Sequence, residues 1–334
     1  MFTSLKDKNG KEIKGSIFEK TFIEIGGIQQ GFFLRAENPE NPVILSLHGG
    51  PGDPEFPMIT YFESSIRLER YFTVVYWDQR GAGMSLCRSI DPATMNIEQM
   101  VEDTRQMTEY LKQRFNQEKI FLMGHSWGSL LGIKTVEKYP ENYWAFIGIG
   151  QVSNFLESEK LAYDLILQHA MEINDRSAIR TLKKVDINSP DFPKYAWFIT
   201  RTQLTNKYGF GFMRKMPSTF KMIKSLLFLK EYTLSEKINW LRSQSFASEL
   251  AQTFYKMNLF ESSTTFQVPI YIIHGKHDYI TSYALAREYF EVIEAPQKGF
   301  FTFENSAHAP HWEERENFIQ IVRNIAFEVK ENQE

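Results

Sequence analysis

The stretch Lys119-Ile-Phe-Leu-Met-Gly-His-Ser-Trp-Gly-Ser-Leu-Leu-Gly132 decides the fold. A short apolar run ends at Gly124, and a helical pattern begins directly after Gly128. Ser126 stands between these two glycines, at the apex of a predicted strand, tight turn and helix. Glycine has no Cβ, so the strand and the helix can approach each other around the turn. We therefore expect a strained turn that projects the serine hydroxyl above a sheet, beside the N-terminal amides of the helix.

The composition limits the classes of protein to which the chain can belong. At 334 residues it is long enough for one large domain with an insertion, or for two small domains. A net charge of −3 predicts no nucleic-acid partner. Cys87 is the only cysteine, which excludes an internal disulfide and a thiolate metal site. The sequence has no apolar run typical of a signal peptide or a membrane span, so we predict a soluble, cytoplasmic protein without a membrane partner.

Strand-like and helical segments alternate over most of the chain. Residues 16–36 read as a β-hairpin around Gly26-Gly27. Strands that alternate with helices predict a parallel sheet with helices on both faces. Buried strands are predicted near 43–47, 72–77, 120–123, 143–149, 268–273 and 299–303, and helices near 58–70, 96–115, 282–292 and 313–330.

Residues 151–245 interrupt this alternation. Strand-like apolar runs are absent there, and helical patterns dominate over 154–173, 175–185, 194–207 and 218–229. We interpret 151–245 as a helical cap inserted into a core made of 1–150 and 246–334, because so long a gap between strands is otherwise hard to place. The alternative is that these helices only thicken the outer layer of the core.

Three unusual loops each follow the carboxyl end of a predicted strand. They cover residues 48–54, 78–85 and 124–128. In open parallel sheets, ligands bind beyond the carboxyl ends of the strands. We therefore expect the three loops to meet at one edge and to form a site there.

A serine hydroxyl is a weak nucleophile at neutral pH, so it needs a base and a group that orients the base. In this kind of fold the expected chain order is serine, acid, histidine. Asp278 and His308 each follow a strand end in that order, which predicts Ser126, Asp278 and His308 as a catalytic triad. His311 remains the alternative base.

Other titratable residues near these positions are predicted to be structural. His274 and His277 share the loop of Asp278, and histidines in loops usually pack or face solvent. Asp78 precedes the serine in the chain, and its neighbour Arg80 offers it an ion pair. We therefore assign Asp78 a place in the scaffold.

Acyl transfer also needs hydrogen-bond donors for a tetrahedral oxyanion. One predicted donor is the backbone N–H of Trp127, which follows the serine. The second is the N–H of Gly50 in the loop 48–54, since Pro51 has no N–H to give. His48, in the same loop, is interpreted as structural.

The chain carries five short motifs, at 48–52, 78–85, 124–129, 274–278 and 306–308. With these motifs it resembles the proline iminopeptidase branch of the α/β-hydrolase superfamily. The resemblance implies an eight-stranded, mostly parallel sheet, a helical cap, no cofactor, no metal, and release of amino-terminal residues, notably proline, from short peptides. By motif position it also places a triad on Ser126, Asp278 and His308 and an oxyanion hole on Gly50 and Trp127. The motifs are His-Gly-Gly-Pro-Gly (48–52), Asp-Gln-Arg-Gly-Ala-Gly-Met-Ser (78–85), Gly-His-Ser-Trp-Gly-Ser (124–129), His-Gly-Lys-His-Asp (274–278) and Ser-Ala-His (306–308).

The chain departs from that family at two places. His125 stands where proline iminopeptidases usually have a second glycine. The cap glutamates that hold the substrate's free amine have no motif to align, and Glu157 and Glu159 are the candidates nearest the strand over 143–149, with Glu172, Glu231 and Glu236 further along.

Three functional hypotheses follow. The first is an aminopeptidase acting on a small molecule or short peptide, and the second is an esterase, lactonase or amidase for small apolar acyl groups. The third is a non-catalytic binding protein, which would have no need of all three triad residues. A dehalogenase or an epoxide hydrolase would need a carboxylate where this chain has Ser126.

Overall fold

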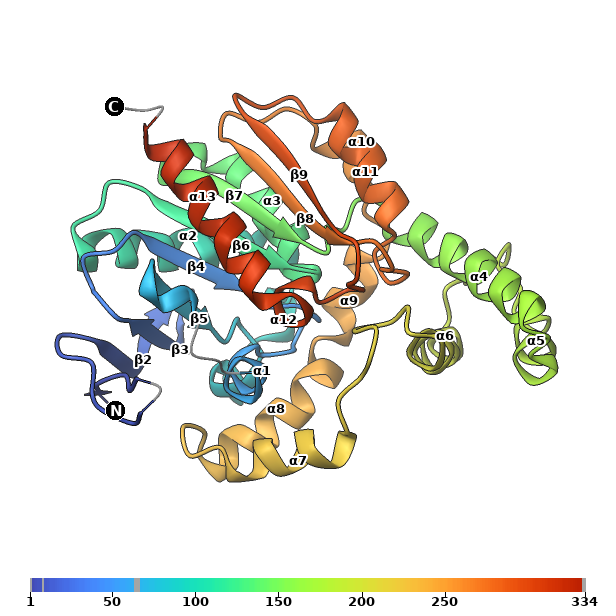
Figure 1. Ribbon diagram of the computed structural model, residues 1–334, viewed down its shortest axis with the longest axis horizontal. Helices are drawn as coiled ribbons and strands as arrows, with labels where there is room; N and C mark the ends of the chain where they lie inside the picture. The colour runs from blue at the N-terminus through green and yellow to red at the C-terminus, as the bar shows by residue number, and fades with distance from the viewer. Residues whose placement is uncertain (1, 8, 63–66, 332–334) are drawn as a thin grey trace.

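The computed structural model describes residues 2–7, 9–62 and 67–331. Eight strands, β2 to β9, form one sheet, and the two-residue strand β1 pairs with its edge (Figure 1). The strand order is β1-β2-β3-β5-β4-β6-β7-β8-β9. The strands are β1 (Phe2–Thr3), β2 (Ile17–Ile25), β3 (Ile28–Ala36), β4 (Val43–Leu47), β5 (Thr73–Trp77), β6 (Ile120–His125), β7 (Tyr143–Ile149), β8 (Ile270–Gly275) and β9 (Lys298–Phe303).

The sheet is mostly parallel, as predicted. β2 and β3 form the expected hairpin, and its two turn residues Gly26 and Gly27 have φ values of 55° and 77°, which favour glycine. β3 joins β5 antiparallel, and every pair from β5 through β9 is parallel. The carboxyl ends of six strands therefore lie at one edge of the sheet.

Alternation along the buried strands divides the apolar side chains between two cores. Ile44 and Phe121 pack on one face of the sheet, whereas Leu45 and Leu122 pack on the other. Helices α2, α3 and α11 cover the face of Leu45, and α13 covers the face of Ile44 (Figure 1). The predicted helices on both faces are confirmed. Their bounds are α2 (Ile97–Phe115), α3 (Trp127–Lys138), α11 (Tyr283–Val292) and α13 (Arg315–Glu331).

Short helices connect the larger elements. Residues 58–70 were predicted to form one helix; instead α1 ends at Tyr61 and a separate 3₁₀ turn spans Leu68–Arg70, while 63–66 lie outside the described residues. The short helices are α1 (Phe56–Tyr61), η1 (Leu68–Arg70), η2 (Gly83–Ser85), η3 (Pro92–Thr94), η4 (Pro140–Asn142) and α12 (Pro310–Glu313).

Between β7 and β8 the described chain contains helices and no strand (Figure 1). A small apolar core around Ile166 and Trp197 joins α4, α5 and α6. Helices α8, α9 and α10 were not among the helices predicted from the sequence. The seven helices are α4 (Phe155–Glu172), α5 (Arg176–Leu182), α6 (Tyr195–Tyr208), α7 (Thr219–Phe228), α8 (Leu234–Phe246), α9 (Ser248–Phe254) and α10 (Leu259–Ser262).

Candidate active site

Ser126 occupies the turn between β6 and α3 with φ 55° and ψ −118°, a backbone conformation that few non-glycine residues adopt. Its backbone N–H donates to the Ile149 carbonyl at 2.9 Å, which fixes the turn against β7. A Cβ on Gly128 would lie 2.0 Å from the Leu47 carbonyl oxygen, and one on Gly124 would lie 2.1 Å from the Gly128 oxygen. Both glycines are therefore required for the close approach that the sequence predicted.

A hydrogen-bond network joins the three loops at the carboxyl edge of the sheet. The Gln79 backbone N–H donates to His48 Nε2 at 3.1 Å, and the Gln79 side-chain amide donates to the His48 carbonyl at 3.2 Å. Trp127 Nε1 donates to Gln79 Oε1 at 3.0 Å. Burial lowers the pKa of His48 to about 4, so its imidazole is neutral near pH 7. These bonds give His48 and Gln79 a structural role at the edge.

The loop that carries Gly50 lies beside the serine turn. A Cβ on Gly49 would lie 3.4 Å from Ser126 Cβ, so the two segments are in contact. Gly50 has φ 112°, and a Cβ there would lie 2.6 Å from the Gly52 backbone nitrogen. The loop therefore depends on glycine at position 50. The proximity that an oxyanion hole needs is present, and the donor roles of Gly50 and Trp127 stay predictions.

Asp278 and His308 meet in the structure, and each side chain lies in a loop that follows a strand. His308 Nδ1 lies 2.7 Å from Asp278 Oδ2. The other carboxylate oxygen accepts the backbone N–H groups of Ile280 at 2.8 Å and Thr281 at 3.0 Å. Burial alone would raise the pKa of Asp278, but His308 and His274 beside it hold that pKa well below its usual value. The carboxylate is therefore ionised and fixes the orientation of the His308 ring.

The His308 ring also lies close to the serine turn. A Cβ on Gly150 would lie 3.0 Å from both Cε1 and Nδ1 of His308. Gly150 directly follows Ile149, whose carbonyl accepts the Ser126 N–H. Ser126 and His308 thus lie against the same end of β7. Because Nδ1 is bonded to Asp278, Nε2 is the ring nitrogen that can serve a nucleophile.

The alternative base, His311, has different neighbours. Its ring packs 4.6 Å from the His125 ring and 4.3 Å from the Trp312 ring, measured between centroids. Its Nε2 lies 3.6 Å from Glu55 Oε1. The structure thus joins His308, and not His311, to Asp278. His274 Nε2 also lies 3.0 Å from Asp278 Oδ2, but its side chain is fully buried.

His125 replaces the expected glycine and has an evident structural role. Its Nε2–H donates to the backbone carbonyl of His308 at 2.9 Å, and the two rings are 4.7 Å apart between centroids. Burial lowers the pKa of His125 to about 3, so the ring is neutral. His125 therefore ties the serine turn to the loop that carries His308.

Parts of the helical stretch between β7 and β8 contact the same loops. The Gly211 carbonyl accepts the backbone N–H of His308 at 3.2 Å, and the Phe212 ring lies 6.3 Å from the His308 ring. A Cβ on Gly52 would lie 2.7 Å from the Ser243 carbonyl oxygen in α8. Two separate segments of this stretch thus border the candidate site.

Similarity to known proteins shows the family of this chain. A model of the serine aminopeptidase family S33 matches residues 68–315. The chain belongs to that family. It is an aminopeptidase-like enzyme of the α/β-hydrolase fold, and the resemblance drawn from its motifs is confirmed.

Several relatives of this S33 protein match it over nearly its whole length. "Probable aminopeptidase YbaC" of Bacillus subtilis is 33% identical over 312 residues, covering 92% of this chain and 96% of that protein. A proline iminopeptidase of Saccharolobus solfataricus is 24% identical over 317 residues, covering 93% of each chain. The crystal structure of a proline iminopeptidase from Mycobacterium smegmatis has a TM-score of 0.67 at 16% identity, covering 95% of this chain and 100% of that one. At that identity the likeness supports the fold alone.

The two candidate glutamates of this S33 protein lie in different surroundings. Glu157 is half-buried, and its carboxylate lies 3.7 Å from Lys160 Nζ. Glu159 is fully buried, and its two oxygens accept Trp197 Nε1 and Arg201 Nη1, each at 2.6 Å. Burial raises the pKa of Glu159, opposed by Arg201 and Trp197. The Glu159–Arg201 pair was not predicted from the sequence.

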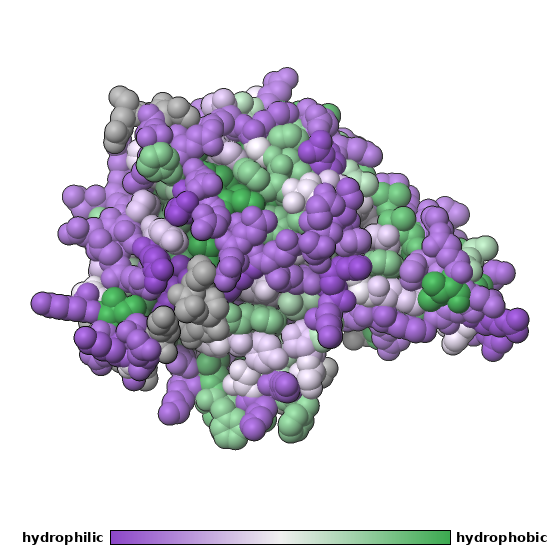
Figure 2. Space-filling view, in the orientation of Figure 1, coloured by the Kyte–Doolittle hydropathy of each residue, from purple (hydrophilic) through white to green (hydrophobic). Residues whose placement is uncertain are grey.

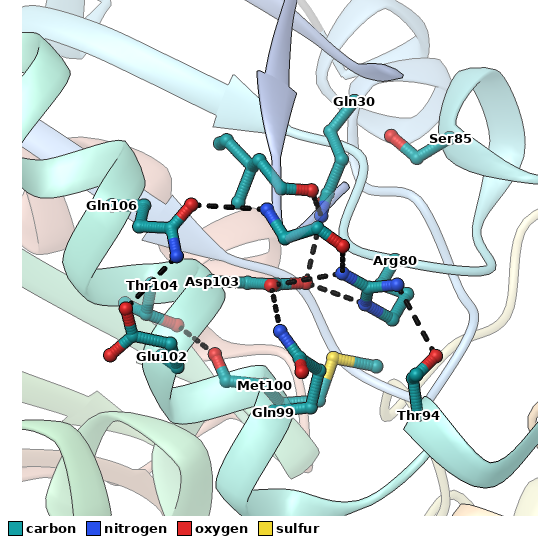
Figure 3. Close-up of polar contacts among 12 residues, drawn as sticks. Gln30, Arg80, Ser85, Thr94, Gln99, Met100, Glu102, Asp103, Thr104 and Gln106 are labelled. Atoms are coloured by element: carbon teal, nitrogen blue, oxygen red, sulfur yellow. Dashed lines mark hydrogen bonds and ion pairs between the residues drawn. The ribbon is translucent and has the colours of Figure 1, made fainter. Parts of the chain in front are cut away.

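The predicted ion pair between Asp78 and Arg80 is wrong. Arg80 instead makes a bidentate pair with Asp103, with Nε to Oδ2 at 2.7 Å and Nη2 to Oδ1 at 3.1 Å (Figure 3). The Asp78 carboxylate accepts the Tyr232 hydroxyl and the Met84 backbone N–H, each at 2.9 Å. Arg80 turns toward α2, so neighbours in the sequence have separate partners.

One signal in the sequence points to the role of Asp103. It lies between Met100 and Met107, three and four residues away, on the apolar stripe of the helix predicted over 96–115. A carboxylate on a buried stripe requires a partner, and Arg80 is that partner.

Among residues 2–7, 9–62 and 67–331 there is no group of three or more His, Cys, Asp or Glu side chains that could hold a metal ion. Within the same described ranges, no helix combines the length and apolar character that a membrane crossing needs.

Proposed function

We propose that this protein is a serine hydrolase that releases amino-terminal residues from short peptides through an acyl-enzyme, as proline iminopeptidases do. The observation that carries the proposal is the 2.7 Å contact of Asp278 with His308, beside a serine held at positive φ. The relatives named as aminopeptidases and proline iminopeptidases support the substrate class.

In the proposed reaction His308 Nε2 takes the proton of the Ser126 hydroxyl as its oxygen attacks the scissile carbonyl. The N–H groups of Trp127 and Gly50 donate to the oxyanion of the tetrahedral intermediate. As the intermediate collapses, the bond to the leaving amine breaks and the amine takes the proton from His308. A water molecule, deprotonated by His308, then attacks the acyl carbon. The ester bond to Ser126 breaks, and His308 returns the proton to the serine oxygen. Asp278, ionised throughout, stabilises the imidazolium form of His308.

We also propose that residues 151–245 form a cap over this site. The contacts of Gly211 and Phe212 with His308, and of Ser243 with the loop that carries Gly50, support this role. Such a cap would exclude water from the acyl-enzyme and limit the length of the peptide that can enter.

Recognition of the substrate's free amine is proposed for the cap glutamates. A buried ammonium needs a carboxylate partner, because an unpaired charge in an apolar site is costly. A carboxylate has about four acceptor positions, so the two donors on Glu159 leave room for a third. A series of ring contacts connects Glu159 to the site. The series leads from Trp127 through Phe254 and Phe155 to Phe198. The Arg201 guanidinium, which is bonded to Glu159, lies over the Phe198 ring.

The second candidate function is hydrolysis of small apolar esters, lactones or amides. The Arg201 guanidinium at 2.6 Å from Glu159 favours it, since a carboxylate that is already paired attracts an ammonium less strongly. The test compares prolyl-naphthylamide, its N-acetylated form and p-nitrophenyl butyrate as substrates. An aminopeptidase should prefer the free amine by about tenfold or more in kcat/KM, or about 1.4 kcal/mol. Equal rates with and without the acetyl group, together with rapid ester cleavage, would establish the esterase function instead.

A further inference from the structure

Helices α7 and α8 form a hairpin that projects from the body of the molecule (Figure 1). Among the residues that the structure describes, fourteen large apolar side chains are exposed, and seven of them lie between 216 and 241. Figure 2 shows apolar side chains gathered at this end of the molecule. The most exposed are Phe220 (75%), Phe228 (73%), Leu234 (73%), Leu241 (69%) and Leu227 (61%).

The exposed apolar residues follow helical spacing. In α7, Phe220 and Leu227 are seven residues apart, so they share one side of the helix. In α8, Leu234, Ile238 and Leu241 stand at positions i, i+4 and i+7, which again places them on one side. Helices of soluble domains normally turn such a stripe toward the core. Both helices of this hairpin therefore present an apolar stripe to their surroundings.

Polar side chains of α8 and of the loop before it already have hydrogen-bond or ion-pair partners in the body of the molecule. The Tyr232 hydroxyl donates to Asp78 at 2.9 Å, and Lys20 pairs with Glu236 at 2.6 Å. Asn239 donates to the Leu86 carbonyl at 2.9 Å, and Trp240 donates to the Pro54 carbonyl at 3.3 Å. The outward stripes are thus the unpartnered side of a firmly anchored element.

The hairpin is positively charged, although the whole chain has a net charge of −3. Residues 214–242 contain seven Lys or Arg and two Glu. Lys221, Lys224 and Lys230 are exposed beside the apolar stripe of α7. Next to α8 a groove of about 590 Å³ adds Arg88 and Arg242, together with Ile238 from the stripe. The hairpin therefore combines apolar side chains with a local excess of positive charge.

We propose that the α7–α8 hairpin docks on the surface of a lipid bilayer that carries anionic headgroups. Helices that lie in a membrane surface combine a Phe- and Leu-rich side with Lys and Arg, which attract anionic lipids. An interfacial helix does not cross the bilayer, so it needs no long apolar span. This surface is separate from the proposed active-site residues.

A second copy of the chain fits this surface less well. Lysine is depleted from protein–protein interfaces, yet Lys221 and Lys224 are exposed beside the apolar stripe of α7. A two-fold dimer through the hairpin would also bring two positively charged segments together. Charge complementarity therefore favours the anionic bilayer.

The test is flotation of the full chain with two kinds of vesicle, phosphatidylcholine alone and phosphatidylcholine mixed with an equal part of phosphatidylglycerol. We expect flotation with the mixed vesicles, weakened by added salt, and little with phosphatidylcholine alone. The variants Phe228→Ser with Leu241→Ser, and Lys221→Glu with Lys224→Glu, should each reduce the bound fraction by about tenfold or more.

Matched controls separate docking from general stickiness. Phe327→Ser removes a side chain that is 65% exposed on α13, and Lys183→Glu with Lys184→Glu reverses two charges near the end of α5. Both controls should float like the wild type, and circular dichroism should show every variant folded. Absence of flotation with the mixed vesicles, or equal losses in the controls, would overturn the proposal. So would sedimentation showing a dimer that the hairpin variants dissociate while vesicles bind none of the proteins.

Discussion

The carboxyl edge of the sheet differs from the helical stretch between β7 and β8 in the kind of side chain that it buries or exposes. At the edge, polar side chains are buried and held by hydrogen bonds. Asp278, for example, accepts two backbone N–H groups and contacts two histidines. In the helical stretch, α7 and α8 leave apolar side chains exposed. A sheet places residues through its strand register, whereas helices joined by loops are placed by side-chain packing. The first region should therefore be sensitive to single changes in chemistry, and the second to changes in surface character.

Ser126 provides the largest expected effect. Ser126→Ala should lower kcat by about 10⁴-fold or more, because it removes the hydroxyl that is proposed to form the acyl-enzyme. A fluorophosphonate probe should label the wild type and leave Ser126→Ala unlabelled. Ser235→Ala, in an exposed position of α8, is the matched control and should be labelled fully. Equal labelling of Ser126→Ala and wild type would disprove the assignment of the nucleophile.

The Asp278–His308 pair comes next. Asp278→Asn and His308→Ala should each lower kcat by about 10³- to 10⁴-fold, and the double variant should lose little more, because the members of a triad act as a unit. Steady-state kinetics of the three variants tests this non-additivity. Independent, multiplicative losses would show that the two residues do not act through each other.

His311→Ala is the control for the choice of base. His311 is as buried as His308, but its Nε2 lies near Glu55 rather than near Asp278. We therefore expect a kcat within about tenfold of wild type. An inactive His311→Ala protein with a nearly normal His308→Ala protein would reverse the assignment.

Strand-end residues could be predicted from the sequence because topology alone brings them together. Once a parallel sheet was inferred, Ser126, Asp278 and His308 had to lie at one edge, and the structure joins Asp278 to His308 there. The steric need for Gly124 and Gly128 could be predicted for the same reason, since the turn itself requires it.

Partners separated by helices could not be predicted in this way. Spacing shows which side of a helix a residue occupies, but not what that side meets. Arg80 was assigned to its neighbour Asp78, yet it reaches Asp103 on α2. Glu159 was considered as a ligand for an amine, and its bonds to Trp197 and Arg201 depend on how α4 packs on α6.

The Arg80–Asp103 pair tests how much a buried ion pair contributes to the stability of the fold. Asp103→Asn leaves the Arg80 guanidinium buried without its counter-charge, so the free energy of unfolding should fall by about 3–5 kcal/mol. The control lies on the same helix: Arg105 pairs with Glu102 at the surface, and Arg105→Ala should cost about 1 kcal/mol or less. Chemical denaturation measures both variants. Similar losses in the two would show that burial does not distinguish the pairs.

The smallest expected effect concerns Glu159 in the helical stretch. It tests whether this buried carboxylate binds the free amine of the substrate. Glu159→Gln should reduce the roughly tenfold preference for a free amine over its acetylated form to near equality, a change of about 1.4 kcal/mol. We expect no larger effect, because the Arg201 guanidinium already offsets part of the negative charge of Glu159. Glu157→Gln removes a half-buried carboxylate that lies beside Lys160, so the amine preference of this variant should stay close to wild type.

Ester cleavage separates this specific effect from loss of structure. Glu159→Gln leaves Arg201 without its charged partner, which should lower stability and weaken all activities together if the fold is affected. p-Nitrophenyl butyrate carries no amine, so its kcat/KM reports the folded active site alone. Retained ester cleavage with a lost amine preference would assign Glu159 to the substrate. An unchanged amine preference in both Glu→Gln variants would leave Glu159 a structural partner of Arg201, and recognition of the amine would have to come from another group.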